Sequence, residues 1–196
     1  QDRGGRIHQH TVVTGFKVQG DRVTAVETSR GDIATDQVIA AAGPHTALLA
    51  ALVGADIPLA PARVEIAITE PVPPMFSGAI SGNGVYGRQT KRGNLAYGGG
   101  PHEWTDVTEM GAPGKPNTPL IRNIARRIYE LFEGAGDVAL IRSWAGIVEE
   151  TPDYLPIFDF LATPRNYLVA CVSGHGFGLC PATGKVTLHD CAKGSR

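Results

Sequence analysis

The chain has 196 residues, of which 42% are hydrophobic and 19% are charged, a composition typical of globular domains. Its 18 lysines and arginines nearly balance its 19 aspartates and glutamates, and the formal net charge of −1 argues against a basic surface for nucleic acid or an anionic membrane. The three cysteines include no Cys-x-x-Cys pair, so we predict a reducing, cytoplasmic location. No apolar run reaches about 18 residues, and no membrane span is predicted.

The first part of the chain predicts a β-meander, a buried strand and a short helix. Strands are expected over residues 6–18 and 23–28, and the sequence "VQGDR" forms the hairpin turn between them. The stretch "DQVIAAAG" at 36–43 contains a continuous apolar run that ends at Gly43, and such a run is typical of a buried strand. A helix over 46–53 follows, and Gly54 ends it.

The pattern changes after residue 59. A strand is predicted over 63–69, and two further strands, 85–90 and 94–97, flank the hairpin sequence "KRG". Residues 117–132 give the strongest helical signal, because apolar residues recur on one face and Asn117 can cap the first turn. The arginines of this helix lie off that face, and we interpret them as solvated surface rather than as a binding patch.

The last part of the chain predicts strands over 138–148 and 167–172 and a helix from Pro181 onward. The stretch "SGHGFGLCPATGK", residues 173–185, follows the last strand, leads into this helix and contains four glycines. A glycine-rich connection between a strand and a helix can bring backbone N–H groups close to a ligand, or it can be a tight turn with no ligand. The small residues at 40–43, where another strand ends before a helix, are a second place of this kind.

Other motifs give little support to a chemistry. The six histidines show no metal-ligand spacing, so no metal site is predicted. The sequence contains no G-x-S-x-G of a serine hydrolase and no Walker or G-x-G-x-x-G phosphate loop. Cys171 lies in an apolar strand and is expected to be inert core.

Four stretches in order resemble one family of enzymes. They are "TSRGDIATDQVIAAAG", "VYGRQTKRGNLAYGGG", "RSWAGIVEETPDYLPIF" and "SGHGFGLCPATGK", and the resemblance that they carry extends over nearly the whole chain. They resemble the FAD-dependent amine oxidoreductases of the D-amino acid oxidase type, which include glycine oxidase, monomeric sarcosine oxidase and the flavin subunits of hydrogen cyanide synthase and opine oxidase. In that family a βαβ dinucleotide-binding unit comes first. No such unit is present here, so the resemblance implies that the chain is the C-terminal half.

The resemblance also implies the fold. An α/β (α+β) architecture is expected, in which part of an FAD-binding Rossmann-like domain carries an inserted antiparallel-sheet substrate domain. Residues 1–59 and 139–196 would form the discontinuous FAD-binding part, and residues 60–138 would form the substrate-binding domain.

Several positions match the cofactor contacts of the family. Val13 would lie by the adenine, and Ala42 and Gly43 would lie near the pyrophosphate. The helix after Pro181 would direct its N-terminus at the flavin, where it would stabilise the negative charge of the reduced ring. The remaining implied FAD contacts are Gly146, Gly174, His175, Gly176, Phe177 and Gly178.

The implied catalytic residues are Tyr86, Arg88 and His175. Tyr86 matches an active-site tyrosine, and Arg88, two residues further on, faces the same side of its strand. A substrate carboxylate needs a fixed cationic fork, which arginine provides, although Arg88 can also be read as a surface residue. Arg142 is the rival candidate. No cysteine of the kind that binds flavin covalently lies near Trp144, so FAD would be held non-covalently.

The implied activity is the oxidation of a small amino acid or secondary amine by hydride transfer to FAD, which gives an imine. Expected partners are this small-molecule substrate and, from the likeness to multi-subunit dehydrogenases, other subunits of a hetero-oligomer. The electron acceptor is either oxygen or a partner subunit. Two alternatives stay open: a truncated, catalytically inactive fragment, and a non-enzymatic α/β binding module.

Overall fold

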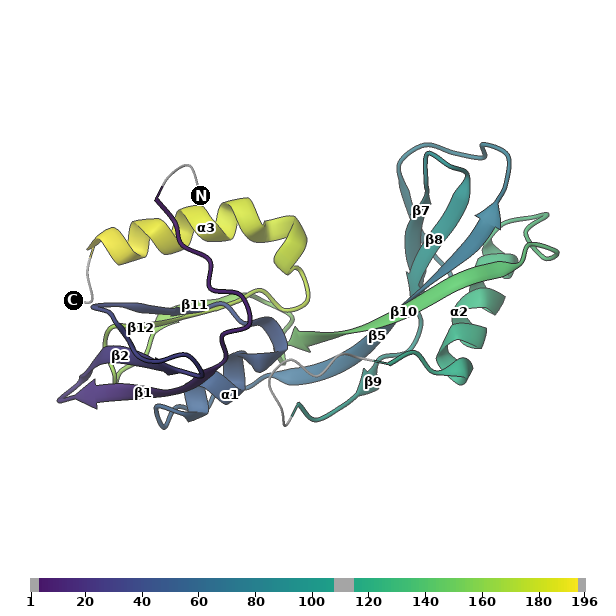
Figure 1. Ribbon diagram of the computed structural model, residues 1–196. Coiled ribbons are helices and arrows are strands. Elements are labelled where there is room, and N and C mark those ends of the chain that lie inside the picture. Colours follow the sequence, from purple (N-terminus) through teal and green to yellow (C-terminus); the bar gives the residue numbers. More distant parts are fainter. Residues whose placement is uncertain (1–3, 108–114, 194–196) are drawn as a thin grey trace. The chain divides into compact units, whose positions relative to one another are not determined.

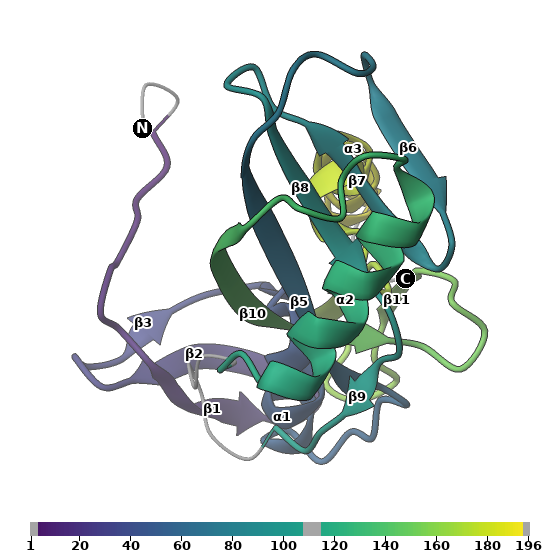
Figure 2. The same cartoon turned by 90° about the vertical axis from the view of Figure 1, so that its right-hand side faces the viewer.

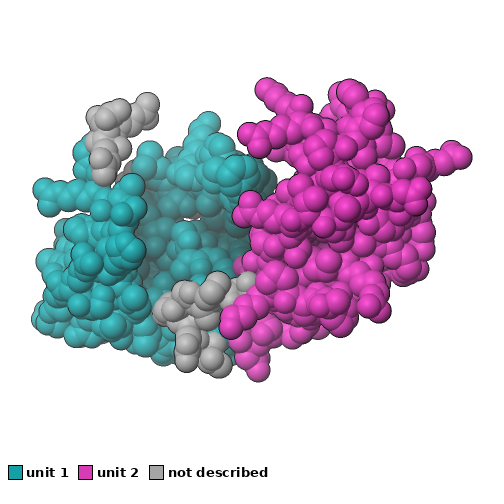
Figure 3. Space-filling model, turned by 45° about the vertical axis from the view of Figure 1, so that its right-hand side comes forward, with its two compact units in different colours: residues 1–60, 107–110, 149–196 teal, residues 61–106, 111–148 magenta. Residues whose placement is uncertain are grey.

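The chain forms two compact units in a computed structural model, which describes residues 4–107 and 115–193 (Figure 1). Unit 1 comprises residues 1–60, 107–110 and 149–196, and unit 2 comprises residues 61–106 and 111–148 (Figure 3). The sequence placed the return to the first unit at residue 139. The return lies ten residues later, because the strand that starts at Leu140 extends the sheet of unit 2.

Unit 1 contains two three-stranded sheets. The first has the order β1 (Val13–Gln19), β2 (Arg22–Thr28), β3 (Ile33–Ala34), and the second has the order β11 (Ile157–Phe160), β12 (Tyr167–Cys171), β4 (Val38–Ala40). The antiparallel pair of β1 and β2 was predicted, although β1 begins at Val13 rather than at residue 6, and β3 was not predicted. In the second sheet β12 runs parallel to β4 and antiparallel to β11. The predicted buried strand β4 therefore belongs to a different sheet from the meander that precedes it.

The core of unit 1 joins these two sheets. Val23 from β2 packs with residues of β4 and β12, and all five residues of β12 are buried, as its continuous apolar run predicted. The Asn166 side chain closes one end of this core. It accepts a hydrogen bond from Val23 N at 2.8 Å and donates to Val23 O at 2.7 Å and to Asp36 O at 2.8 Å.

Helices follow both parallel strands of unit 1. After β4 come a 3-10 turn, Gly43–His45, and α1, Thr46–Ala51. After β12 comes α3, Gly176–Lys193, which contains Pro181. The prediction that this helix starts at Pro181 was wrong. It rested on the preference of proline for a first helical turn, whereas the helix begins as soon as the left-handed turn at Ser173 and Gly174 (φ 48° and 77°) has ended.

Unit 2 is built on one sheet with the order β10-β5-β8-β7-β6, and β9 pairs with β5. Its strands are β5 (Ala60–Pro71), β6 (Ala79–Gly82), β7 (Val85–Gln89), β8 (Asn94–Gly99), β9 (Glu103–Trp104) and β10 (Leu140–Glu150). The predicted hairpin around "KRG" is confirmed as β7 and β8. β6 was missed, because this four-residue strand directly follows a proline-rich segment.

One helix, α2 (Thr118–Leu131), covers one face of this sheet (Figure 2). The sequence predicted it with its cap: the Asn117 side chain accepts a hydrogen bond from Leu120 N at 2.9 Å. Ile124 and Ile128 pack against Leu95 and Tyr97, along with other apolar residues of the same cluster. The opposite face of the sheet is left uncovered by this helix. Among the described residues, no helix combines the length and apolarity that crossing a membrane requires.

Candidate functional site

A cavity of about 580 Å³ lies on the sheet of unit 2 and draws its lining from five strands. Residues that line it include Ile66, Ile68, Tyr86, Arg88, Ala96 and Trp144. The neighbours of these residues in sequence, such as Ala67, Val85 and Tyr97, belong to the core under α2. Because side chains alternate along a strand, the cavity lies on the sheet face that α2 leaves uncovered.

Tyr86 and Arg88 are brought together at this cavity by their spacing on β7. Tyr86 pairs with Gly98 and Arg88 pairs with Ala96 on β8, so each large side chain stands opposite a small residue. Tyr86 is 53% exposed. Sequence reasoning named these two residues, and the structure places both in one cavity; their catalytic roles stay predictions.

A glycine between them is required by close packing. A Cβ atom at Gly87 would lie 2.1 Å from the Ala96 carbonyl oxygen and 2.7 Å from the ring of Tyr97. Any side chain at this position would therefore push β7 away from β8 and displace Tyr86 and Arg88 together. Sequence reasoning did not single out Gly87, although its place between two candidate residues was a signal.

The two candidate arginines of unit 2 differ in their contacts. The Arg142 guanidinium carbon lies 5.3 Å from the centre of the Trp144 ring, a cation–π contact. Arg88 is exposed, and within residues 4–107 and 115–193 it has no hydrogen-bond or ion-pair partner. Its donors are therefore available to a ligand in the cavity. Trp144, which lines the same cavity, was not among the predicted site residues.

Unit 1 brings a second group of predicted residues to one edge. Because β4 and β12 are parallel neighbours, their C-terminal ends lie at the same edge of the sheet. Each strand ends in a turn that has a left-handed glycine, Gly43 with φ 56° and Gly174 with φ 77°, and leads into a helix. Ala42, Gly43 and Gly174 are thus placed at one edge of the sheet, and their contacts with a cofactor stay predictions.

The sequence predicted that Gly176 and Gly178 lie in a loop. The structure places both in the first turn of α3. The N–H groups of a first turn have no partner within their own helix, and α3 has no acidic residue there. Phe177 is 98% exposed, and a Cβ at Gly178 would meet nothing within 4 Å. The N-terminus that was expected after Pro181 therefore lies at Gly176.

His175 is fixed by the turn that precedes α3. Its Nδ1 lies 2.6 Å from the Ser173 carbonyl oxygen. Because a carbonyl only accepts hydrogen bonds, Nδ1 carries the proton that is donated. The Ser173 side chain in turn accepts a hydrogen bond from Thr151 N at 3.1 Å. The arrangement orients the imidazole, and the catalytic role of His175 stays a prediction.

Two other predicted cofactor residues lie elsewhere. Val13 is the first residue of β1, half-buried, in the other sheet of unit 1. Gly146 lies on β10 within unit 2, where a Cβ would meet nothing within 4 Å. Their contacts with a cofactor stay predictions.

A buried carboxylate at the edge of unit 1 was missed by sequence reasoning. Glu149 is 5% exposed and accepts a hydrogen bond from the Cys171 thiol, with 3.7 Å between Sγ and Oε1. Burial raises the pKa of Cys171 to about 11, and the nearby carboxylate contributes to this rise. Cys171 is therefore a neutral thiol in the core, as predicted.

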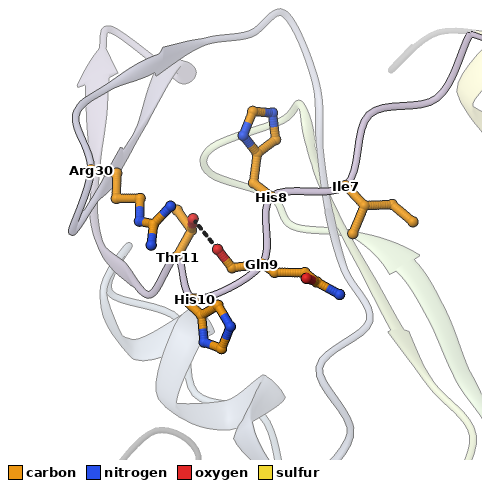
Figure 4. Close-up of a pocket in the computed structure, with 6 residues that line it drawn as sticks. All are labelled: Ile7, His8, Gln9, His10, Thr11 and Arg30. Carbon is orange, nitrogen blue, oxygen red and sulfur yellow. Dashed lines mark hydrogen bonds between the residues drawn. The ribbon is translucent and has the colours of Figure 1, made fainter.

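Another cavity, of about 460 Å³, is lined by the segment Ile7–Thr11 and by Arg30 (Figure 4). The side chains of His8 and His10 point to opposite sides of this segment (Figure 4). Within the part of the chain that the structure describes, no three histidine, cysteine or acidic side chains gather as metal ligands would.

A comparison with known families decides the class of this protein. The family model described as "FAD dependent oxidoreductase" (DAO) matches residues 1–189. The chain belongs to this family. FAD is the cofactor of the DAO family, in agreement with the prediction from the sequence.

Several curated proteins are similar to this DAO-family chain. Sarcosine oxidase subunit beta of Arthrobacter sp is 31% identical over 97% of this chain and 46% of its own length. The corresponding subunit of Rhodobacter capsulatus is 29% identical over 98% and 46%. Hydrogen cyanide synthase subunit HcnC of Pseudomonas protegens is 29% identical over 89% and 40%. The chain thus spans about half the length of the curated relatives that it matches.

Solved structures show the same DAO fold. L-proline dehydrogenase from P. horikoshii superimposes with a TM-score of 0.82 at 25% identity, over 100% of this chain and 53% of that one. Glycine oxidase from Geobacillus kaustophilus gives 0.78 at 22% identity, over 92% and 48%. The mixed α/β fold expected from the sequence is confirmed, and the preceding βαβ unit stays an expectation.

Proposed function

We propose that this chain provides the substrate-binding unit and part of the FAD site of an enzyme that oxidises a small amino acid or secondary amine. The observation that carries the proposal is the cavity of unit 2, in which the Arg88 fork has no partner among the described residues and lies beside Tyr86. Such a fork matches a substrate carboxylate, and the apolar walls formed by Ile66 and Trp144 match a small apolar body.

Each residue at the cavity has a task in this proposal. Arg88 binds the carboxylate through two parallel hydrogen bonds and so fixes the orientation of the adjacent carbon. The hydroxyl of Tyr86 supplies a second polar contact on the same strand. Arg142 is the weaker candidate for the carboxylate, because its guanidinium already packs on Trp144.

The residues at the edge of unit 1 fit a part of FAD. Gly43 and Gly174 adopt left-handed conformations that leave their turns without side chains, and the first-turn N–H groups of α3 can bind an electron-rich edge of a ligand. FAD, when bound, supplies the acceptor for a hydride from the carbon next to the substrate amine, which leaves an imine. The chain itself has to orient the substrate and keep its amine unprotonated.

In this proposal unit 1 is the FAD-binding part and unit 2 is the substrate-binding domain. Relatives named as subunits, sarcosine oxidase subunit beta and HcnC, support further subunits as partners. The electrons then pass either to oxygen or to such a subunit.

The proposal is tested with the full-length protein that contains these residues. We expect the purified protein to show flavin absorbance and to lose it when mixed, without oxygen, with one member of a panel of small amino acids and N-methyl amino acids. Absence of flavin binding, even after FAD is added, would favour the inactive fragment or the binding module. Flavin that no amine reduces would refute the amine oxidation but leave the cofactor in place.

A further inference from the structure

The carboxylate of Glu149 is an unusual group to find buried. It is 5% exposed, and burial of an ionised carboxylate is costly unless it is paired. Within residues 4–107 and 115–193 its hydrogen-bond partner is the Cys171 thiol, and no cation pairs with it. A thiol is a weak donor, and it reaches only Oε1. The second oxygen therefore needs a donor that the described protein does not supply.

The free oxygen lies beside a turn that we assign to the cofactor. A Cβ built on Gly43 would lie 3.4 Å from Oε2 of Glu149. The main chain of Glu149 is close to the second turn as well, because its carbonyl oxygen would lie 3.8 Å from a Cβ at Gly174. Glu149 thus lies beside the turns that follow both strands, at the edge that we assign to the cofactor.

The same oxygen remains accessible from outside. Among the described residues, Oε2 of Glu149 has no hydrogen-bond partner in the protein. Other side-chain atoms without a partner are fully enclosed, but Oε2 of Glu149 is not one of them. A ligand group seated on the Gly43 turn can therefore reach it. The φ of 56° favours glycine at residue 43, and glycine leaves the space beside this oxygen free of a side chain.

The charge of this site decides which part of FAD it can bind. A carboxylate accepts hydrogen bonds from hydroxyl and N–H groups, and it repels a phosphate. The resemblance implied that Gly43 lies near the pyrophosphate. With Glu149 beside it, contact between this turn and a phosphate is disfavoured, whereas a sugar hydroxyl is favoured. FAD carries such hydroxyls on its ribityl chain and on its adenosine ribose.

We propose that Glu149 is a cofactor-binding residue that accepts a hydrogen bond from a sugar hydroxyl of FAD at the Gly43 turn. This inference rests on the proposed function, because it requires that the protein bind FAD. Cys171 holds the carboxylate from the inner side, and the hydroxyl completes its coordination from the outer side. The pyrophosphate then binds away from Gly43.

The test combines variants of Glu149 with FAD analogues in the full-length apoprotein. One set of analogues lacks single ribityl hydroxyls, and a second set lacks single hydroxyls of the adenosine ribose, which distinguishes the two sources. Dissociation constants are measured by titration of flavin fluorescence. Glu149→Met keeps the approximate size and removes the acceptor, Glu149→Gln keeps a neutral acceptor, and Glu150→Gln is the matched control on the next residue of β10.

For the wild-type protein we expect one analogue to bind about 10- to 150-fold more weakly than FAD, as for the loss of a hydrogen bond to a charged group. This difference should fall below about twofold in Glu149→Met, be intermediate in Glu149→Gln and be unchanged in Glu150→Gln.

Two results would overturn the inference alone. In the first, the wild-type protein binds FAD but no analogue differs from FAD by more than about threefold. In the second, one analogue binds weakly but the same difference persists in Glu149→Gln and Glu149→Met. A wild-type protein that does not bind FAD would overturn the proposed function together with the inference. The first result needs only the wild-type protein, and the second can be read from Glu149→Gln alone if Glu149→Met does not fold.

Discussion

Replacing Arg88 by lysine tests the proposed substrate site most directly. Lysine keeps the positive charge but loses the planar fork, so it cannot make two parallel hydrogen bonds to a carboxylate. Arg88 has no competing partner in the described part of the chain, and the substitution should therefore act on the substrate rather than on the fold. Loss of one charge-assisted hydrogen bond costs about 1.5–3 kcal/mol, which lowers kcat/KM by about tenfold to 150-fold.

The assay is steady-state kinetics of the full-length protein with its amino-acid substrate, together with the FAD content of each variant. Arg92→Lys, in the turn between β7 and β8, is the matched control, because Arg92 is exposed and does not line the cavity. An analogue of the substrate without the carboxylate should be turned over slowly but equally by wild type and Arg88→Lys. If Arg88→Lys resembles the wild type and Arg142→Lys is impaired, the carboxylate binds to Arg142 and our reasoning is refuted.

Three further predictions concern the cofactor and stability. Gly178→Ala should weaken FAD binding, measured by titration, by about 5- to 150-fold, because the added methyl group would occupy space next to the ligand. Gly184→Ala in the same helix is the control: a Cβ at either glycine would meet no protein atom within 4 Å, and this variant should bind FAD like the wild type. Asn117→Ala should lower the free energy of unfolding in urea by about 0.5–2 kcal/mol, because Leu120 N loses its cap; no change would show that the cap is dispensable. Burial raises the pKa of Tyr167 from 10.0 to about 12, so the unfolded state ionises first and stability should fall between these pH values by about 1.4 kcal/mol per pH unit. Tyr167→Phe should abolish this part of the alkaline loss in urea titrations, and an equal loss in both proteins would contradict the assignment.

The sequence predicted those helices and strands whose pattern lies within a single stretch of residues. The helix α2 was predicted with its cap, because its apolar period and Asn117 lie within one stretch of sequence. The hairpin of β7 and β8 was predicted from its turn, and β12 from its unbroken apolar run. The short strands β3, β6, β9 and β11 were missed, because each depends on a partner strand rather than on its own pattern.

Some residues of the candidate site could likewise be predicted from local sequence, and others could not. Tyr86 and Arg88 could be placed on one face from the period of two along a strand. The cavity around them also needs Trp144 and Ile66, which come from strands distant in sequence. The burial of Glu149 could not be predicted, because the residue lies just before "TPD", a typical turn sequence. Its burial depends on Cys171 and the Gly43 turn, which are distant in sequence.

The bonds of Asn166 have a consequence for how the chain folds during synthesis. The side chain of this residue bonds to Val23 and Asp36, and β12 pairs with β4, so unit 1 needs residues 23–40 together with residues 166–171. Unit 2 is assembled from residues 61–106 and 111–148, which leave the ribosome earlier than Asn166. Unit 2 can thus fold while the apolar face around Val23 still awaits its C-terminal complement. Chains that stop before Asn166 would present this face to chaperones and proteases, so quality control can tell an unfinished product from a finished one.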